Sequence, residues 1–370
     1  MSGEAKAGKE HLATLDLLRL VAALSVLAFH YLFRSSVSGE MATAYPEVAP
    51  VAIYGYLGVN LFFLISGFVI AWSAEGRSWE TFGLARFIRL YPGHVVCMTL
   101  TFLVMLVLAP AAFPVSGAQY LANLTMFAPA LGQPFMDGVY WSIVLELVFY
   151  GWVTLALLTG GFQRLKLELV MVWLAVSALN EFVIGSGALR MIFITEFGPY
   201  FAGGILVHHM MSRGISQGAL MLLIAAFLMS CNTLTVTQGW MQAHYGTSVP
   251  LPGLIVANVV MHGLLIAAVV FRARLKPSTL TLALGGLTYP LYLLHQHIGY
   301  VGIDAAAPML GKWSAAAMIT VAIIVISWAI WRFIEAPSQR RLRAVLVPKA
   351  TWLIGRIRRR VHLPTGNVVR

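Results

Sequence analysis

The sequence predicts an all-α protein, a polytopic bundle of about ten transmembrane helices with both termini in the cytoplasm. Apolar residues make up 59% of the 370 residues, charged residues make up only 11%, and the mean hydropathy is +0.81. A soluble domain typically carries about a quarter charged residues. The chain therefore lacks the polar residues that a water-facing surface needs, and lipid is the expected surrounding medium.

Ten segments are long and apolar enough to be membrane spans. A span needs roughly 20 mainly apolar residues to cross about 30 Å of hydrocarbon. In chain order, the expected spans are residues 14–33, 53–73, 88–109, 140–159, 167–184, 193–211, 218–237, 251–271, 280–302 and 313–333.

The first expected span has features of a secretory signal peptide, because Lys6 and Lys9 precede the apolar run and small residues 36–38 follow it. Arg19 and His30 lie inside the run and argue for a first helix that is retained in the protein.

The later spans are supported to different degrees. Residues 214–271 contain no Asp, Glu, Lys or Arg over a length sufficient for two spans, and residues 313–331 are likewise uncharged. Gly203 and Gly204 interrupt the sixth expected span, and two glycines with Pro290 interrupt the ninth. Such breaks are tolerated where other helices enclose the segment.

The basic residues predict the orientation, because short loops rich in Lys and Arg stay in the cytoplasm. With the N-terminus inside, 22 of the 25 basic residues fall on the cytoplasmic side. Only Arg34, Arg190 and Lys312 fall outside. A missed span would move every later loop to the opposite side of the membrane and remove this asymmetry. The distribution of basic residues therefore supports the number of spans as well.

The formal net charge of +11 therefore reflects topology, and no nucleic-acid partner is expected. We divide the chain into a cytoplasmic segment 1–13, a membrane domain 14–337 and a basic cytoplasmic tail 338–370. The tail can lie against anionic lipid headgroups or serve a dedicated partner. Cys97 and Cys231 both fall in apolar segments, which suggests neither a disulfide framework nor a metal cluster.

Arg19 and His30 are the polar residues of the first span. Eleven positions at about 100° each bring them to one helix face, about 16 Å apart along the axis. Histidine can take and return a proton near neutral pH, which suits general base catalysis. The alternative is a hydrogen-bonded histidine that only packs against its neighbours.

Arg86 and Arg89 precede the third span and share a helix face at this spacing. Their forked donors match phosphate oxygens, so they could hold a phosphorylated ligand. They could equally be ordinary cytoplasmic anchors of the membrane domain.

Ionisable residues mark three further spans, and such groups are usually functional or paired. Glu146 is the only charge in the fourth span, where Trp141 could be an interfacial aromatic residue. His295 lies in the ninth span. Glu335 closes the tenth, and a local ion pair with Arg332 is the alternative to a functional role. No metal site is expected, because the remaining histidine pairs have poor geometry for one ion.

Together these residues resemble the acyltransferase family 3 membrane proteins, which include bacterial O-acetylases of lipopolysaccharide O-antigen, exopolysaccharide, Nod factors and peptidoglycan. The resemblance runs from Leu15 to Pro337. It rests on four features in order: Arg19 with ten residues before His30; the string Gly58 to Phe68, with Ser66, followed by Arg86 and Arg89; Trp141-Ser142 with Glu146 and Phe149-Tyr150; and Tyr292 with His295 before Glu335-Ala336-Pro337.

The resemblance implies a bacterial inner-membrane enzyme that moves an acyl group, most commonly acetyl, from acyl-CoA to a sugar hydroxyl of a cell-surface glycan. Acyl-CoA is then a co-substrate, no cofactor is bound, and the carbohydrate acceptor can be lipid-linked. In this family His30 looks like the essential histidine, acting as general base or transient acyl carrier, with Glu146 as a second catalytic residue. Arg19, Arg86 and Arg89 look like the donor-binding set. The residues expected to line the site are Ser66, Trp141, Tyr150, Tyr292, His295 and Glu335.

Two departures from the family pattern leave the acceptor step open. Many relatives carry a fused extracytoplasmic domain, which is not found here, so transfer is either direct or aided by a separate extracytoplasmic protein. The usual serine of one helix motif is replaced by the sequence Thr288-Tyr289-Pro290. The competing class is a transporter or flippase, since polar residues around a cavity also form a substrate pathway. A catalytically inactive scaffold is a third interpretation.

Overall fold

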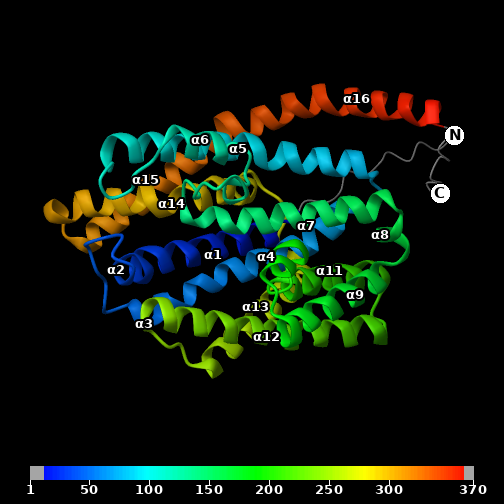
Figure 1. Ribbon diagram of the computed structural model, residues 1–370, viewed down its shortest axis with the longest axis horizontal. Coiled ribbons are helices and arrows are strands. Elements are labelled where there is room, and N and C mark those ends of the chain that lie inside the picture. Colours follow the sequence, from blue (N-terminus) through cyan, green and yellow to red (C-terminus); the bar gives the residue numbers. More distant parts are fainter. Residues whose placement is uncertain (1–11, 362–370) are drawn as a thin grey trace.

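The computed structural model describes residues 12–361, which form a bundle of helices without a strand in that range (Figure 1). The polytopic helical bundle predicted from the sequence is thereby confirmed, while the orientation of the termini stays a prediction. Most of the predicted N-terminal segment, with Lys6 and Lys9, and the last part of the predicted tail, 362–370, lie outside the described residues.

Helices of eight residues or more make up most of the described chain. They are α1 (Ala13–Phe29), α4 (Leu57–Ala74), α5 (Trp79–Leu108), α7 (Trp141–Leu158), α9 (Lys166–Leu179), α11 (Gly198–Arg213), α12 (Gln217–Tyr245), α13 (Leu251–Val270), α14 (Thr279–Leu310), α15 (Lys312–Ile330) and α16 (Ala336–Val361). The shorter helices are α2 (Ser35–Val37), α3 (Ala49–Ala52), α6 (Gly117–Asn123), α8 (Gly161–Arg164) and α10 (Gly187–Phe193), with 3₁₀ turns at Ile53–Tyr56, Ala128–Leu131, Gly138–Tyr140 and Arg272–Arg274.

Within residues 12–361, nine helical segments are long and apolar enough to cross a membrane. They account for every expected span except the ninth. That span is α14, a continuous helix of 32 residues that contains Pro290 and carries the buried polar residues Thr288, His295 and Gln296. α14 packs along α1 and α15. We therefore count it as the tenth span, an enclosed helix whose polar side chains face other helices.

Several helices extend beyond the expected spans. α5 begins at Trp79, so Arg86 and Arg89 lie inside this helix and not before it. At the other end of the chain, helix continues without interruption from Lys312 to Ile354. The expected boundary between membrane domain and tail at residue 337 falls inside that helix, and the division stays a prediction. Figure 1 shows α16 along one edge of the bundle, beside α5.

The sixth expected span is interrupted, but not at its two glycines. α10 ends at Phe193 and α11 begins at Gly198, and between them Ile194 adopts the left-handed conformation with φ 53° and ψ 38°. Gly204 instead permits close packing, because a Cβ there would overlap the carbonyl of Leu64 in α4. Small residues let helices in membranes approach in this way.

Three spans contain a π-helical turn, at His30–Arg34, Asn180–Ile184 and Trp331–Glu335. A π-turn holds one residue more than an α-turn and therefore changes which face the following side chains occupy; such turns are frequent at functional sites. Here each one begins or ends at a buried polar residue, namely His30, Asn180 and Glu335.

Candidate active site

Two cavities lie inside the bundle and share Val59 and Tyr292 in their walls. We call the first, of about 130 Å³, the arginine cavity. The predicted site residues that line it are Arg19, Ser66, Arg86, Arg89, Glu146, Tyr150 and Tyr292. We call the second, of about 510 Å³, the histidine cavity. The predicted site residues that line it are His30, Trp141 and Tyr292.

Arg19 and His30 thus line different cavities, whereas their spacing in the first helix predicts one groove. α1 carries Arg19 toward its start, and His30 follows its last residue, where the π-turn begins. The two cavities adjoin at Val59 and Tyr292, which line both.

The three arginines of the first cavity have different partners. Arg19 donates to Asp16 at 3.2 Å, and Arg89 forms an ion pair with Glu335. Arg86 lies over the rings of Phe82 and Tyr150, and among the described residues it forms no ion pair. Its buried Nε atom also has no hydrogen-bond partner there. Arg86 is therefore the cation of this cavity that is best placed to bind an anionic ligand.

Glu335 is fully buried and pairs across the bundle, not with Arg332 three residues earlier. The π-turn at the end of α15 directs its side chain inward, where it meets Arg89 and accepts a hydrogen bond from Gln339 at 2.8 Å. The ion pair ties α5 to the junction of α15 and α16. A local ion pair, the alternative drawn from the sequence, is not formed.

Glu146 belongs to the arginine cavity. Its carboxylate accepts hydrogen bonds from Ser66 at 3.1 Å and from the hydroxyl of Tyr150 one helical turn later. In the described part of the chain no hydrogen bond joins Glu146 to His30. The position beside His30 is taken by His295 of α14.

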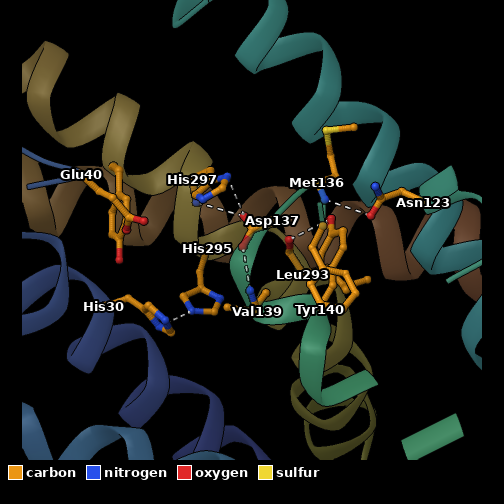
Figure 2. Close-up of polar contacts among 12 residues, drawn as sticks. His30, Glu40, Asn123, Met136, Asp137, Val139, Tyr140, Leu293, His295 and His297 are labelled. Carbon is orange, nitrogen blue, oxygen red and sulfur yellow. Dashed lines mark hydrogen bonds and ion pairs between the residues drawn. The ribbon is translucent and has the colours of Figure 1, made fainter. Parts of the chain in front are cut away.

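His30 and His295 face one another with a nitrogen-to-nitrogen distance of 3.0 Å, from His30 Nδ1 to His295 Nε2 (Figure 2). His295 Nδ1 lies 2.8 Å from the carbonyl oxygen of Tyr292. A carbonyl can only accept, so His295 Nδ1 must carry a proton, and in the neutral ring Nε2 then accepts. His30 Nδ1 is therefore the donor of the pair, consistent with its 2.9 Å contact to the Val26 carbonyl.

The consequence is a defined tautomer of His30. With its proton on Nδ1, the neutral ring keeps a lone pair on Nε2, and His30 lines the histidine cavity. This is the protonation state that a general base or a nucleophile requires. The sequence singles out both histidines but does not predict that they form a pair.

Asp137 helps to hold the part of α14 that carries His295, and the sequence does not mark it as a site residue. It is fully buried and accepts hydrogen bonds from the backbone N–H groups of Val139 at 3.2 Å and His297 at 3.1 Å. Figure 2 shows it close to His295. Asp137 thus fastens α14, next to its catalytic candidate, to the segment that leads into α7. The only available signal was an acidic residue directly before an apolar span.

The histidine cavity also contains polar and aromatic residues that the sequence did not indicate as site residues. They are Arg34, Asn60, Arg190, Glu196, Trp240, Tyr245 and Gln296. Within residues 12–361, no group of three or more His, Cys, Asp or Glu side chains is arranged to hold a metal ion. The lone pair that the His30 tautomer leaves on Nε2 can in principle take a proton or attack a carbonyl.

The fold defines a multi-pass membrane protein in which a buried histidine pair lies at a large cavity, and a smaller cationic cavity shares two wall residues with it. A family model described as an acyltransferase domain matches residues 12–332. The chain belongs to this acyltransferase family, and it is a multi-pass membrane acyltransferase.

The chain is also similar in sequence to two individual proteins. It is 26% identical over 381 residues to nodulation protein 10 of Rhizobium leguminosarum bv. viciae, covering 92% of this chain and 96% of the relative. It is 30% identical over 147 residues to the acyltransferase MdmB of Streptomyces mycarofaciens, covering 38% of this chain and 37% of that relative. No solved structure matches the chain.

Proposed function

We propose that this acyltransferase moves an acyl group, acetyl in the first instance, from acyl-CoA to a sugar hydroxyl of a cell-surface glycan such as lipopolysaccharide O-antigen or exopolysaccharide. The observation that carries the proposal is the position of His30, whose ring lines one cavity while Tyr292 joins that cavity to the one lined by arginines. A donor and an acceptor that enter from opposite sides could meet there.

The arginine cavity is the proposed donor site. Arg86, with Arg19 and Arg89 near it, would pair with phosphate groups of acyl-CoA. With the termini in the bacterial cytoplasm, this cavity faces the compartment that supplies acyl-CoA, and the histidine cavity faces the outside of the inner membrane.

In the first proposed route, His30 Nε2 takes the proton of the acceptor hydroxyl as its oxygen attacks the thioester carbonyl. The carbon–sulfur bond breaks, and the CoA thiolate receives the proton from the imidazolium. His295 Nε2 accepts from His30 Nδ1–H throughout and so supports the charge that develops on the ring. In the second route, His30 Nε2 attacks the thioester carbonyl, the carbon–sulfur bond breaks and CoA leaves as the thiolate. The acceptor oxygen then attacks the acyl-imidazole carbonyl, the bond from Nε2 to the acyl carbon breaks, and the hydroxyl proton passes to the CoA thiolate. Both routes need the same tautomer.

The test is transfer of labelled acetyl-CoA by the purified full-length protein in liposomes. General base catalysis contributes on the order of 10²–10⁴ in rate, so His30→Ala is expected to lose transfer by that factor and still bind the donor. Arg86→Ala is expected to weaken donor binding about tenfold or more, because a hydrogen-bonded charge is lost. Normal activity of His30→Ala would reject the assignment. Solute movement without thioester consumption would instead support a transporter.

A separate extracytoplasmic protein remains part of this proposal. If the purified protein releases CoA from the thioester but acylates no added glycan, the addition of periplasmic extract should restore transfer. An acyltransferase that depends on such a partner would release CoA in a His30-dependent way both with and without the extract.

A further inference from the structure

A broken helix forms part of the wall of the histidine cavity. Residues 187–213 make up one candidate span, yet the helix stops after Phe193 and resumes at Gly198. Ile194 between them holds a left-handed conformation, which β-branched residues rarely adopt. Non-helical backbone within a membrane is tolerated where it is buried in protein or lines a cavity, and broken helices of this kind form substrate sites in transporters.

A dense hydrogen-bond network holds the broken segment in place. Arg190 donates to Glu181 through Nε and Nη2, at 3.0 and 2.6 Å, and Thr195 donates to the same carboxylate at 2.6 Å. Asn180 donates to Thr195 at 2.9 Å. Two indole N–H groups donate to the carbonyls at the end of α10, Trp152 to Ile192 and Trp173 to Phe193. Glu196, the next residue after this network, is thereby fixed in the cavity wall.

The charged residues around the histidine cavity differ in whether they have an ion-pair partner. Arg34 is paired with Glu40, and Arg190 with Glu181. Glu196 is partly buried, and among the described residues no donor makes a hydrogen bond to its carboxylate. Both cations thus already have carboxylate partners, although Arg190 also attracts Glu196 electrostatically. The carboxylate of Glu196 accepts no hydrogen bond from the described residues and is available to a ligand.

We propose that Glu196 is an acceptor-binding residue, and that it selects uncharged polyhydroxyl acceptors and excludes anionic ones. The inference rests on the proposed function and specifies its acceptor. A carboxylate only accepts hydrogen bonds, which suits the hydroxyl groups of a neutral sugar. Trp141 and Trp240 line the same cavity and supply apolar area for the sugar ring. A carboxylate or phosphate on the acceptor would face the negative charge of Glu196.

Matched acceptors test the selection directly. p-Nitrophenyl glucoside and p-nitrophenyl glucuronide differ only in whether carbon 6 is a hydroxymethyl group or a carboxylate. The wild-type protein is expected to prefer the glucoside by about tenfold or more in kcat/KM, because like charges in a partly buried site repel. Glu196→Gln is expected to raise the KM for the glucoside about tenfold and to reduce the preference to about threefold or less. Glu168→Gln, an exposed glutamate of α9, is the matched control and should change neither value.

A second measurement does not depend on activity. In a chain with Cys97→Ala and Cys231→Ala, Thr237→Cys places a single thiol in the cavity wall. Its rates of modification by methanethiosulfonates that carry a trimethylammonium or a sulfonate group report the local charge. Glu196→Gln is expected to lower the ratio of the trimethylammonium rate to the sulfonate rate by about tenfold. Glu168→Gln should leave this ratio unchanged.

The outcomes separate the inference from the proposed function. If the wild-type protein releases no CoA from any thioester, the proposed function fails, and with it the acceptor assignment. If it transfers acyl groups but Glu196→Gln alters neither the preference between the two acceptors nor the ratio of modification rates, only the role of Glu196 is rejected. A thiol at position 237 that neither reagent reaches would also reject it, since the cavity would then be closed to solutes.

Discussion

The arginine cavity and the histidine cavity share two wall residues but are built in different ways. The first is lined by charged residues that regular helices carry, such as Arg86 in α5 and Glu146 in α7. The second takes its key residues from irregular backbone, because His30 begins a π-turn and Glu196 follows the break at Ile194. The difference shows that side chains on regular helices suffice to gather charges around a cavity, whereas His30 and Glu196 reach the other cavity from irregular backbone.

The largest expected effect concerns stability, and it separates two arginines of the same cavity. Removal of Arg89 leaves the carboxylate of Glu335 buried without its cation, a change that typically costs 3–5 kcal/mol. Arg89→Met should therefore lower the thermal unfolding temperature in lipid nanodiscs substantially. Arg86→Met has no such partner to abandon and should lower that temperature little while weakening donor binding.

The double variant Arg89→Met/Glu335→Gln removes the unpaired charge and should recover much of the lost stability. If Arg89→Met and Arg86→Met lower the unfolding temperature equally, the division of the cavity into a structural and a ligand-binding arginine is wrong.

The next largest effect concerns catalysis in the histidine cavity. His295→Leu removes the acceptor of His30 Nδ1–H, so the tautomer and the orientation of the base are no longer fixed. Transfer should fall by about a hundredfold, within the range that a positioned base contributes. His295→Gln offers an amide oxygen as a substitute acceptor and should retain a substantial part of the rate. The measurement is kcat for transfer from acetyl-CoA, with donor binding as the check on folding.

A leucine variant that transfers acyl groups at the wild-type rate would mean that His295 serves only to fill space. Equal loss in the leucine and glutamine variants would mean that His295 contributes something other than an acceptor for His30 Nδ1–H. Donor affinity offers a second comparison, because the arginine cavity should bind acyl-CoA normally in both variants.

The sequence predicted the helical bundle and most of the arginine cavity, since isolated ionisable residues in apolar spans are conspicuous and their roles are few. It did not predict the three π-turns or the break at Ile194. Those features depend on tertiary packing, such as the pairing of Glu335 with Arg89, that no local pattern records. For the same reason the glycines of the sixth span predict an interruption that α11 does not have, since Gly204 serves close packing against α4. Asp137 escaped notice because its partners are backbone N–H groups, which every residue except proline possesses.

The smallest expected effect tests whether the histidine pair depends on the residues behind it. Tyr31 is buried, and its hydroxyl donates to the carbonyl of His295 at 2.7 Å. Tyr45 makes the same kind of bond, at 2.8 Å, to the carbonyl of Lys312, far from both cavities. Each Tyr→Phe change should cost about 1 kcal/mol of stability. Only Tyr31→Phe should also slow transfer, by a few fold, because the lost bond fixes the backbone that carries His295. Equal transfer rates in the two variants would mean that Tyr31 is not needed to hold His295 in place. The position of His295 would then be fixed by Asp137 and by the α14 helix itself.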